Sequence, residues 1–214
     1  DLVLVVISII AGRVFPMFTR NATRVSTIRS IPALDVASVV ALAPLLVADA
    51  LAWPATIGAV CAACASLLSA LRARHWGAQH VLGQPLLWIL HAGYLWLVVG
   101  LALRALSGFG LPVPSALAWH VLTVGTIGSL TLGMMARVAL GHTGRMLTPS
   151  PMVAWAFAAV NAAVVARVFV PWLMPSWYFG ALVASGVLWT LGFGIFLVVY
   201  TPFLLSPRVD GKPG

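Results

Sequence analysis

Long apolar runs separated by short polar breaks constrain the fold of this chain more than any other feature. Hydrophobic residues make up 62% of its 214 residues and charged residues only 7%, which leaves too little polar surface for a water-soluble fold of this size. The breaks predict one partial helix and six full helices, at 1–15, 33–52, 54–72, 84–106, 115–141, 152–171 and 178–201. Each full helix is close to the roughly 20 residues that cross a hydrocarbon core. We therefore predict an all-α, polytopic transmembrane helix bundle that forms a single transmembrane domain over residues 1–214.

The arginine and lysine residues predict the orientation of this bundle. Nine of the twelve follow the first, third, fifth and last spans, whereas the links near residues 53, 107–114 and 172–177 contain none. In an up-and-down bundle these nine then fall on one side, and positive residues favour the cytoplasmic side. We predict a cytoplasmic C-terminus. The same rule explains the net charge of +8, so we expect the lipid bilayer as a partner and no nucleic acid.

Small residues predict where two of the helices make close contacts. On a helical wheel they gather on one face of the fourth helix, as Gly93 and Gly100, and on one face of the fifth, as Gly125, Ser129 and Gly133. Small residues at such spacings let neighbouring backbones approach closely in a membrane. We predict tight helix packing at these positions.

Three histidines in the same two helices are candidate metal ligands: His91, His120 and His142. Ionisable groups at membrane depth are costly and often mark a site, and neutral imidazole binds haem iron and copper well. Along straight helices His91 and His120 differ in depth by about 13 Å, which disfavours one haem between them, whereas His91 and His142 fit one site. Tyr94 lies on the face of His91 and is a candidate hydrogen-bond partner. The alternative interpretation is a polar seam of hydrogen bonds between helices.

Other candidate ligands have simpler interpretations. His75 and His80 fall in the loop between the third and fourth helices, where we expect them to be exposed to solvent. Cys61 and Cys64 lie in an apolar run without a following histidine, so we interpret them as small packing residues and not as a covalent haem attachment site.

Three motifs occur in order along the chain. They are GRVFPMFTRN at 12–21, LHAGYLW at 90–96, and a longer segment at 120–145 that contains GMMARV and GHTGR. Together they resemble the NnrS family of bacterial membrane proteins, which contain haem and copper and are linked to nitric oxide stress. The resemblance covers nearly all of the chain. Since the chain also opens with Asp1 inside an apolar run, we expect it to be the C-terminal seven spans of a protein with about twelve, whose N-terminal spans would be a further partner.

The resemblance implies a site and a location. Its cofactors are b-type haem and copper, and its ligand is nitric oxide or an iron complex of nitric oxide. The implied location is the bacterial cytoplasmic (inner) membrane, as a multi-pass protein. The residues that it implies are the ligands His91, His120 and His142, with Tyr94 beside the cofactor and Arg13, Arg20 and Arg137 as partners of haem propionates or another anion.

Three functions from different classes follow from these features. The leading hypothesis is a haem- and copper-binding protein of the nitric oxide (nitrosative stress) response, and the sequence does not decide whether it is an enzyme. The alternative is a polytopic transporter with a histidine-lined substrate path, for which discontinuous helices would be expected. Pro44 interrupts the second predicted span, but no matching interruption occurs elsewhere. The third hypothesis is a structural membrane subunit with hydrogen-bonded histidines.

Overall fold

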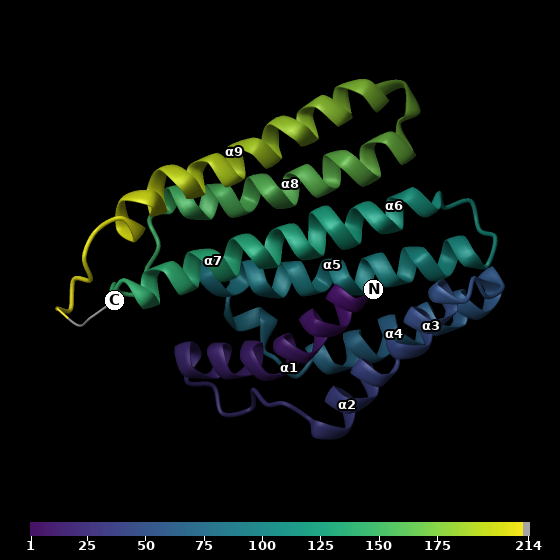
Figure 1. Cartoon of the computed structure of the whole chain (residues 1–214), viewed down its shortest axis with the longest axis horizontal. Coiled ribbons are helices and arrows are strands. Elements are labelled where there is room, and N and C mark those ends of the chain that lie inside the picture. Colours follow the sequence, from purple (N-terminus) through teal and green to yellow (C-terminus); the bar gives the residue numbers. More distant parts are fainter. Residues whose placement is uncertain (212–214) are drawn as a thin grey trace. The chain divides into compact units, whose positions relative to one another are not determined.

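The computed structural model describes residues 1–211, which form helices and connecting loops without a β-strand (Figure 1). Seven segments of this part are long and apolar enough to cross a membrane, which confirms the all-α polytopic prediction. The elements are α1 (Leu2–Thr23), α2 (Pro32–Val40), α3 (Ala43–Ala50), α4 (Ala55–Ala73), η1 (Ala78–His80), α5 (Pro85–Gly108), α6 (Ser115–His120), η2 (Val121–Gly128), α7 (Ser129–His142), α8 (Pro151–Leu173), η3 (Pro175–Trp177) and α9 (Tyr178–Leu204).

The first helix is longer than the predicted partial helix at 1–15. α1 contains 22 residues, with Pro16 inside it, and is long enough to cross a membrane. A proline ends most helices in water, but membrane helices tolerate it where threonine or serine side chains bind nearby carbonyl groups. The Thr19 hydroxyl donates a hydrogen bond to the Phe15 carbonyl at 2.8 Å in the turn that follows the proline. The helix continues through Pro16 to Thr23, beyond the point where the sequence pattern placed its end.

The second span is interrupted, as Pro44 predicts. α2 ends at Val40 and α3 begins at Ala43, with Ala41 and Leu42 forming a turn between them. Pro44 lies in the first turn of α3, where its missing N–H costs no helical hydrogen bond. Two short helices thus occupy one span.

The fifth span is not a uniform α-helix. A π-helical segment, η2, separates α6 from α7 and begins directly after His120. Each turn of a π-helix contains more residues than an α-helical turn. The rotation of 100° per residue that a helical wheel assumes therefore does not hold through this segment.

Contacts within the chain define two compact units. The first contains Asp1–Gly83 and Tyr94–Leu122, and the second contains Gln84–Gly93 and the residues from Thr123 onward. The unit boundaries cut through α5 and through η2.

In the first unit, the later part of α5 packs against α4 and the start of η2. A methyl group at Gly100 would lie 2.6 Å from the Leu122 side chain, and one at Gly108 would lie 2.9 Å from the Ala55 carbonyl oxygen. The Ser66 hydroxyl of α4 also donates to the Val98 carbonyl at 2.9 Å. The close approach predicted at Gly100 is confirmed.

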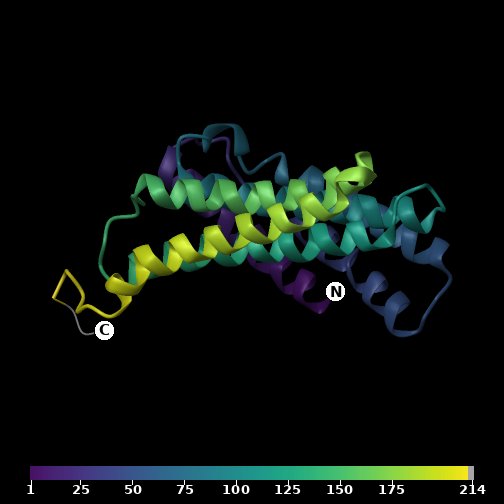
Figure 2. The same cartoon turned by 90° about the horizontal axis from the view of Figure 1, so that it is seen from above.

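In the second unit, glycines again mark close contacts. A methyl group at Gly93 would lie 2.5 Å from Leu130, and one at Gly133 would lie 2.7 Å from Ile89. The start of α5 therefore packs tightly on α7, as the sequence predicts. α8 and α9 lie side by side in both views (Figure 1, Figure 2), and the Ser185 hydroxyl links them by donating to the Ala163 carbonyl at 2.9 Å.

Candidate functional site

A buried arginine organises the interior of the first unit. The side chain of Arg72, near the end of α4, is only 1% exposed. Its Nη2 donates to the Ser8 carbonyl at 2.9 Å and to the Ser8 hydroxyl at 3.0 Å, and its Nε donates to the Tyr94 hydroxyl at 3.2 Å. Its Nη1 lies 3.6 Å from Asp35 Oδ1. A buried charge is tolerated only with partners of this kind, so the residues around Arg72 form a polar network inside an apolar unit.

Aromatic rings border the same guanidinium group. The Arg72 Cζ atom lies 5.0 Å from the ring centroid of Trp76 and 5.3 Å from that of Tyr94. These two rings are 4.6 Å apart, and Phe15 meets both of them edge to face. Cation–π attraction is strongest away from water, so the rings stabilise the buried charge together with the hydrogen bonds.

A cavity of about 410 Å³ lies beside this network, within the first unit and between α1, α2 and α4. Its polar residues are Arg13, Ser30, Asp35 and Arg72. Gly12 also lines it, and a methyl group there would lie 2.9 Å from Arg72 Nη1 and 3.1 Å from Asp35 Oδ1. Only glycine therefore leaves room for the ion pair at this point.

A second charged cluster in the first unit surrounds Arg104 of α5. Arg104 Nη1 donates to both carboxylate oxygens of Asp1 at 3.0 Å, and Nη2 pairs with Asp49. The guanidinium group lies 4.9 Å from the Trp119 ring centroid. Since each charge here has an opposite charge beside it, the cluster ties α1, α3 and α5 together.

The predicted histidine ligands lie in both units. His91, on α5, and His142, at the end of α7, belong to the second unit, whereas His120, at the end of α6, belongs to the first. His91 and His120 are half-buried, and His142 is exposed. The backbone carbonyl of His142 accepts a hydrogen bond from Arg208 Nη1 at 2.9 Å. Within residues 1–211 no group of three or more histidine, cysteine, aspartate or glutamate side chains is arranged to hold a metal ion.

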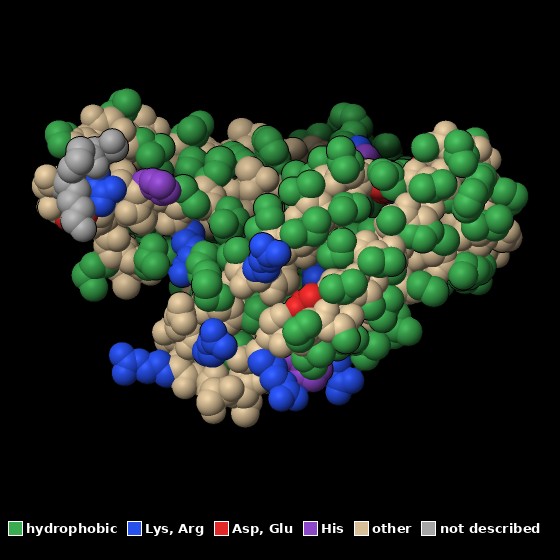
Figure 3. All heavy atoms as spheres, turned by 60° about the horizontal axis from the view of Figure 1, so that its bottom comes forward, with side chains coloured by type: hydrophobic (Ala, Val, Ile, Leu, Met, Phe, Trp, Pro, Cys, Tyr) green, Lys and Arg blue, Asp and Glu red, His purple; other side chains and the backbone are tan. Residues whose placement is uncertain are grey.

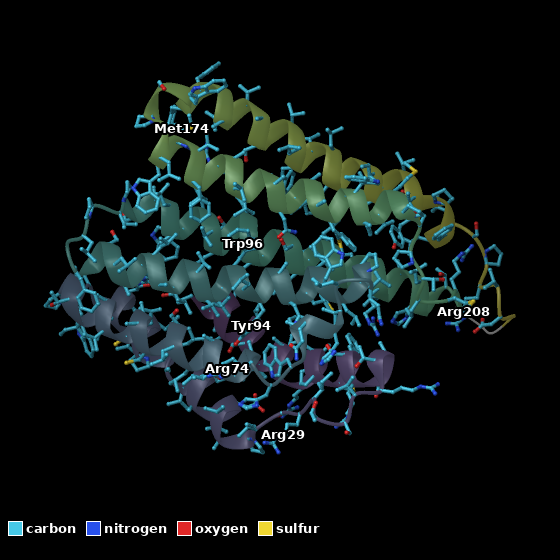
Figure 4. All side chains as sticks on the ribbon, turned by 180° about the vertical axis from the view of Figure 1, so that it is seen from behind. Arg29, Arg74, Tyr94, Trp96, Met174 and Arg208 are labelled. Atoms are coloured by element: carbon cyan, nitrogen blue, oxygen red, sulfur yellow. The ribbon has the colours of Figure 1, made fainter. Side chains whose placement is uncertain are left out.

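The other predicted site residues differ in their surroundings. Tyr94 is buried in the Arg72 network, while Arg137 of α7 is half-buried. Arg13 and Arg20 are exposed. Several arginine or lysine side chains gather at the lower edge of the face shown in Figure 3, whereas Tyr94, labelled in Figure 4, is buried. Of these predicted site residues, Tyr94 is therefore buried, Arg137 is half-buried, and Arg13 and Arg20 are exposed.

The loop histidines follow the expectation only in part. His80 is exposed, as predicted, and its ring lies 3.2 Å from the Gln79 side-chain amide. His75 is half-buried because the loop folds back toward the segment before α2, where the Arg29 N–H donates to the His75 carbonyl at 3.1 Å.

Sequence reasoning missed Arg72 and Asp35 as site residues. In the sequence Arg72 is one of the basic residues that follow the third predicted span, and no predicted site includes Asp35. Asp35 is one of only four acidic residues in the sequence. A rare carboxylate in an apolar helix is the signal that could have pointed to a buried cation.

Seven apolar helices and an intramembrane network of charged and aromatic residues define the class as a polytopic helical membrane protein. A family model described as NnrS protein matches residues 1–208, so the chain belongs to the NnrS family. Membership of this family is consistent with a membrane protein whose role is related to nitric oxide. No curated protein and no solved structure matches the chain.

Proposed function

We propose that the protein binds haem within the bacterial inner membrane and takes part in the response to nitric oxide. Membership of the NnrS family carries the proposal, since the resemblance implies haem, copper and nitric oxide. It is supported by the positions of His91 and His120, which are half-buried in apolar spans. The π-helical segment after His120 adds support, because such segments are frequent at functional sites.

The donor set of this chain fits haem better than copper. Haem iron needs one or two axial ligands from the protein, which single imidazoles can supply. A protein copper site combines several nitrogen and sulfur donors, and no group of three or more histidine, cysteine, aspartate or glutamate side chains forms such a site among residues 1–211. We therefore propose His91 and His120, each on its own and not as a pair on one haem, as the first candidates for an axial haem ligand. His142 is exposed at a helix end. It is the candidate for copper, which would need further ligands besides this imidazole.

The residues of the chain would have distinct tasks at such a site. Burial of the His91 and His120 rings limits the access of water to their ligating nitrogens. Arg137, half-buried on α7, and Arg20, exposed near the end of α1, are cations suited to haem propionates. When bound, haem iron would hold nitric oxide directly. Nitric oxide is small and apolar enough to reach that position through the lipid.

The optical spectrum of the purified full-length protein tests this proposal. We expect a Soret band that shifts when nitric oxide is added, and that is lost or displaced in His91→Ala or His120→Ala. His80→Ala is the matched control because His80 is an exposed histidine in a loop, and its spectrum should be unchanged. A colourless wild-type protein without iron would refute the haem proposal.

One observation favours a second candidate, the transporter. The second span consists of two short helices, α2 and α3, with a turn between them, and discontinuous helices commonly form substrate sites in transporters. α2 also lines the cavity beside Arg72. Uptake of a solute into proteoliposomes by protein that contains neither iron nor copper would support this function over the first.

A further inference from the structure

We propose that the cavity between α1, α2 and α4 binds an anionic phospholipid whose headgroup carries hydroxyl groups, of which phosphatidylglycerol is the simplest. The proposal concerns a site apart from the histidines and does not rest on haem binding. Three properties of the cavity support it: the order of polar and apolar residues along its walls, its net charge, and a carboxylate that can accept a further hydrogen bond.

The first property is a polarity gradient in one direction. On α2, Asp35 lies in the first turn, and Val36, Val39 and Val40 follow it along the helix. On α1, Ile9 lies one turn before Arg13, farther from the loop that joins α1 to α2. On both helices the charged residue is therefore nearer the connecting loop and the apolar residues lie deeper in the span. A phospholipid has the same arrangement, with its phosphate at the surface and its acyl chains in the hydrocarbon.

The second property is the charge of the wall. It carries two arginines and one carboxylate, Arg13, Arg72 and Asp35, and hence a net charge of +1. Arg72 is paired with Asp35, and among residues 1–211 Arg13 has no ion-pair partner and is exposed. Basic pockets between membrane helices on the cytoplasmic side bind anionic headgroups. The phosphate of the lipid would pair with Arg13.

The third property selects the kind of headgroup. Asp35 Oδ1 is buried and accepts no hydrogen bond, because Arg72 Nη1 is 3.6 Å away, whereas the other oxygen, Oδ2, accepts one from Ser30. A distance of 3.6 Å is too long for a direct hydrogen bond. The reachable part of this carboxylate is on the side of Oδ2, since the Asp35 side chain is 21% exposed and the hydrogen bond from Ser30 is exposed. A glycerol hydroxyl beside the phosphate could donate a second hydrogen bond to Oδ2. Choline cannot donate a hydrogen bond, and the ammonium of ethanolamine would face the nearby Arg72 guanidinium.

Native mass spectrometry of the purified full-length protein tests the proposal. Phosphatidylglycerol, phosphatidylethanolamine and phosphatidylcholine with identical acyl chains are added separately, and the fraction of protein with one bound lipid is measured. We expect the apparent Kd for phosphatidylglycerol to be at least about fivefold lower than for the other two, the factor typical of one basic residue near a membrane. Arg13→Gln should remove this preference.

Two further variants separate the site from general surface charge. Arg24→Gln removes the same charge from an exposed arginine outside the cavity wall, and it should retain the preference. Val36→Trp fills the apolar wall without a change of charge and should weaken binding of phosphatidylglycerol. Equal retention of the three lipids would overturn the proposal, as would equal effects of Arg13→Gln and Arg24→Gln. Displacement of the lipid by millimolar inorganic phosphate would overturn it in favour of a site for free anions.

Discussion

Tyr94→Phe tests whether the Arg72 network stabilises the fold. The substitution removes one oxygen atom, which accepts hydrogen bonds from Arg72 Nε and Nη2. Nη2 keeps both oxygen atoms of Ser8 as acceptors, whereas Nε loses its acceptor. The ring remains packed on Trp76 and Phe15, so no cavity forms. Hydrogen bonds to charged groups contribute about 1.5–3 kcal/mol in proteins, and interhelical ones in membranes about 0.6–1.7 kcal/mol, so we expect a loss of about 1.5 kcal/mol.

The assay is the free energy of unfolding in mixed micelles, followed by circular dichroism as the fraction of denaturing detergent rises. Tyr178→Phe is the control because that tyrosine is 57% exposed, and it should change stability by less than about 0.5 kcal/mol. A loss below about 0.5 kcal/mol in Tyr94→Phe would refute the stabilising role of the network. The Soret band is a second readout: its loss at unchanged stability would instead assign Tyr94 to the cofactor, as the family resemblance implies.

Two other predictions concern helix packing in the second unit. Gly93→Ala places a methyl group 2.5 Å from the Leu130 side chain and should destabilise the protein by about 1–3 kcal/mol in the same unfolding assay. Gly186→Ala, at a helical glycine with open space around it, should leave stability unchanged or slightly raised. Ser185→Ala removes the donor to the Ala163 carbonyl and should cost about 0.6 kcal/mol, measured against a Ser206→Ala control outside the α8–α9 contact.

The sequence predicts the helices well because their lengths are set by the thickness of the membrane. Because about 20 apolar residues are needed to cross a membrane, the length of each span can vary only a little. Six of the seven spans lie close to their predicted ranges. The first does not, because its helix continues through Pro16 to Thr23. The close contacts at Gly93, Gly100 and Gly133 were predictable for a similar reason, since a small residue on a helix face has few other uses in an apolar span.

The π-helical segment is beyond such reasoning. A helical wheel assumes one rotation per residue, and nothing in Val121–Gly128 signals a wider turn. Thr126, inside the segment, and Ser129, just after it, are fully buried with hydroxyl groups that have no hydrogen-bond partner. In a regular α-helix such hydroxyls usually bond to a carbonyl four residues earlier. Tertiary packing, and not local preference, therefore decides the shape of this part of the fifth span.

Arg72 shows why the site could not be read from helix positions alone. The positive-inside rule uses only the place of a basic residue along the chain, and by that measure Arg72 and Arg74 are equivalent. In an α-helix, however, side chains lean toward the N-terminus of the helix. At the end of α4 this direction leads back into the span, so Arg72 reaches Ser8 and Tyr94 and is buried. Arg74 is the cap residue beyond the last turn of α4 and is exposed (Figure 4). Two residues of separation rotate a side chain to the other side of a helix, and only the structure shows on which side the carboxylate of Asp35 lies.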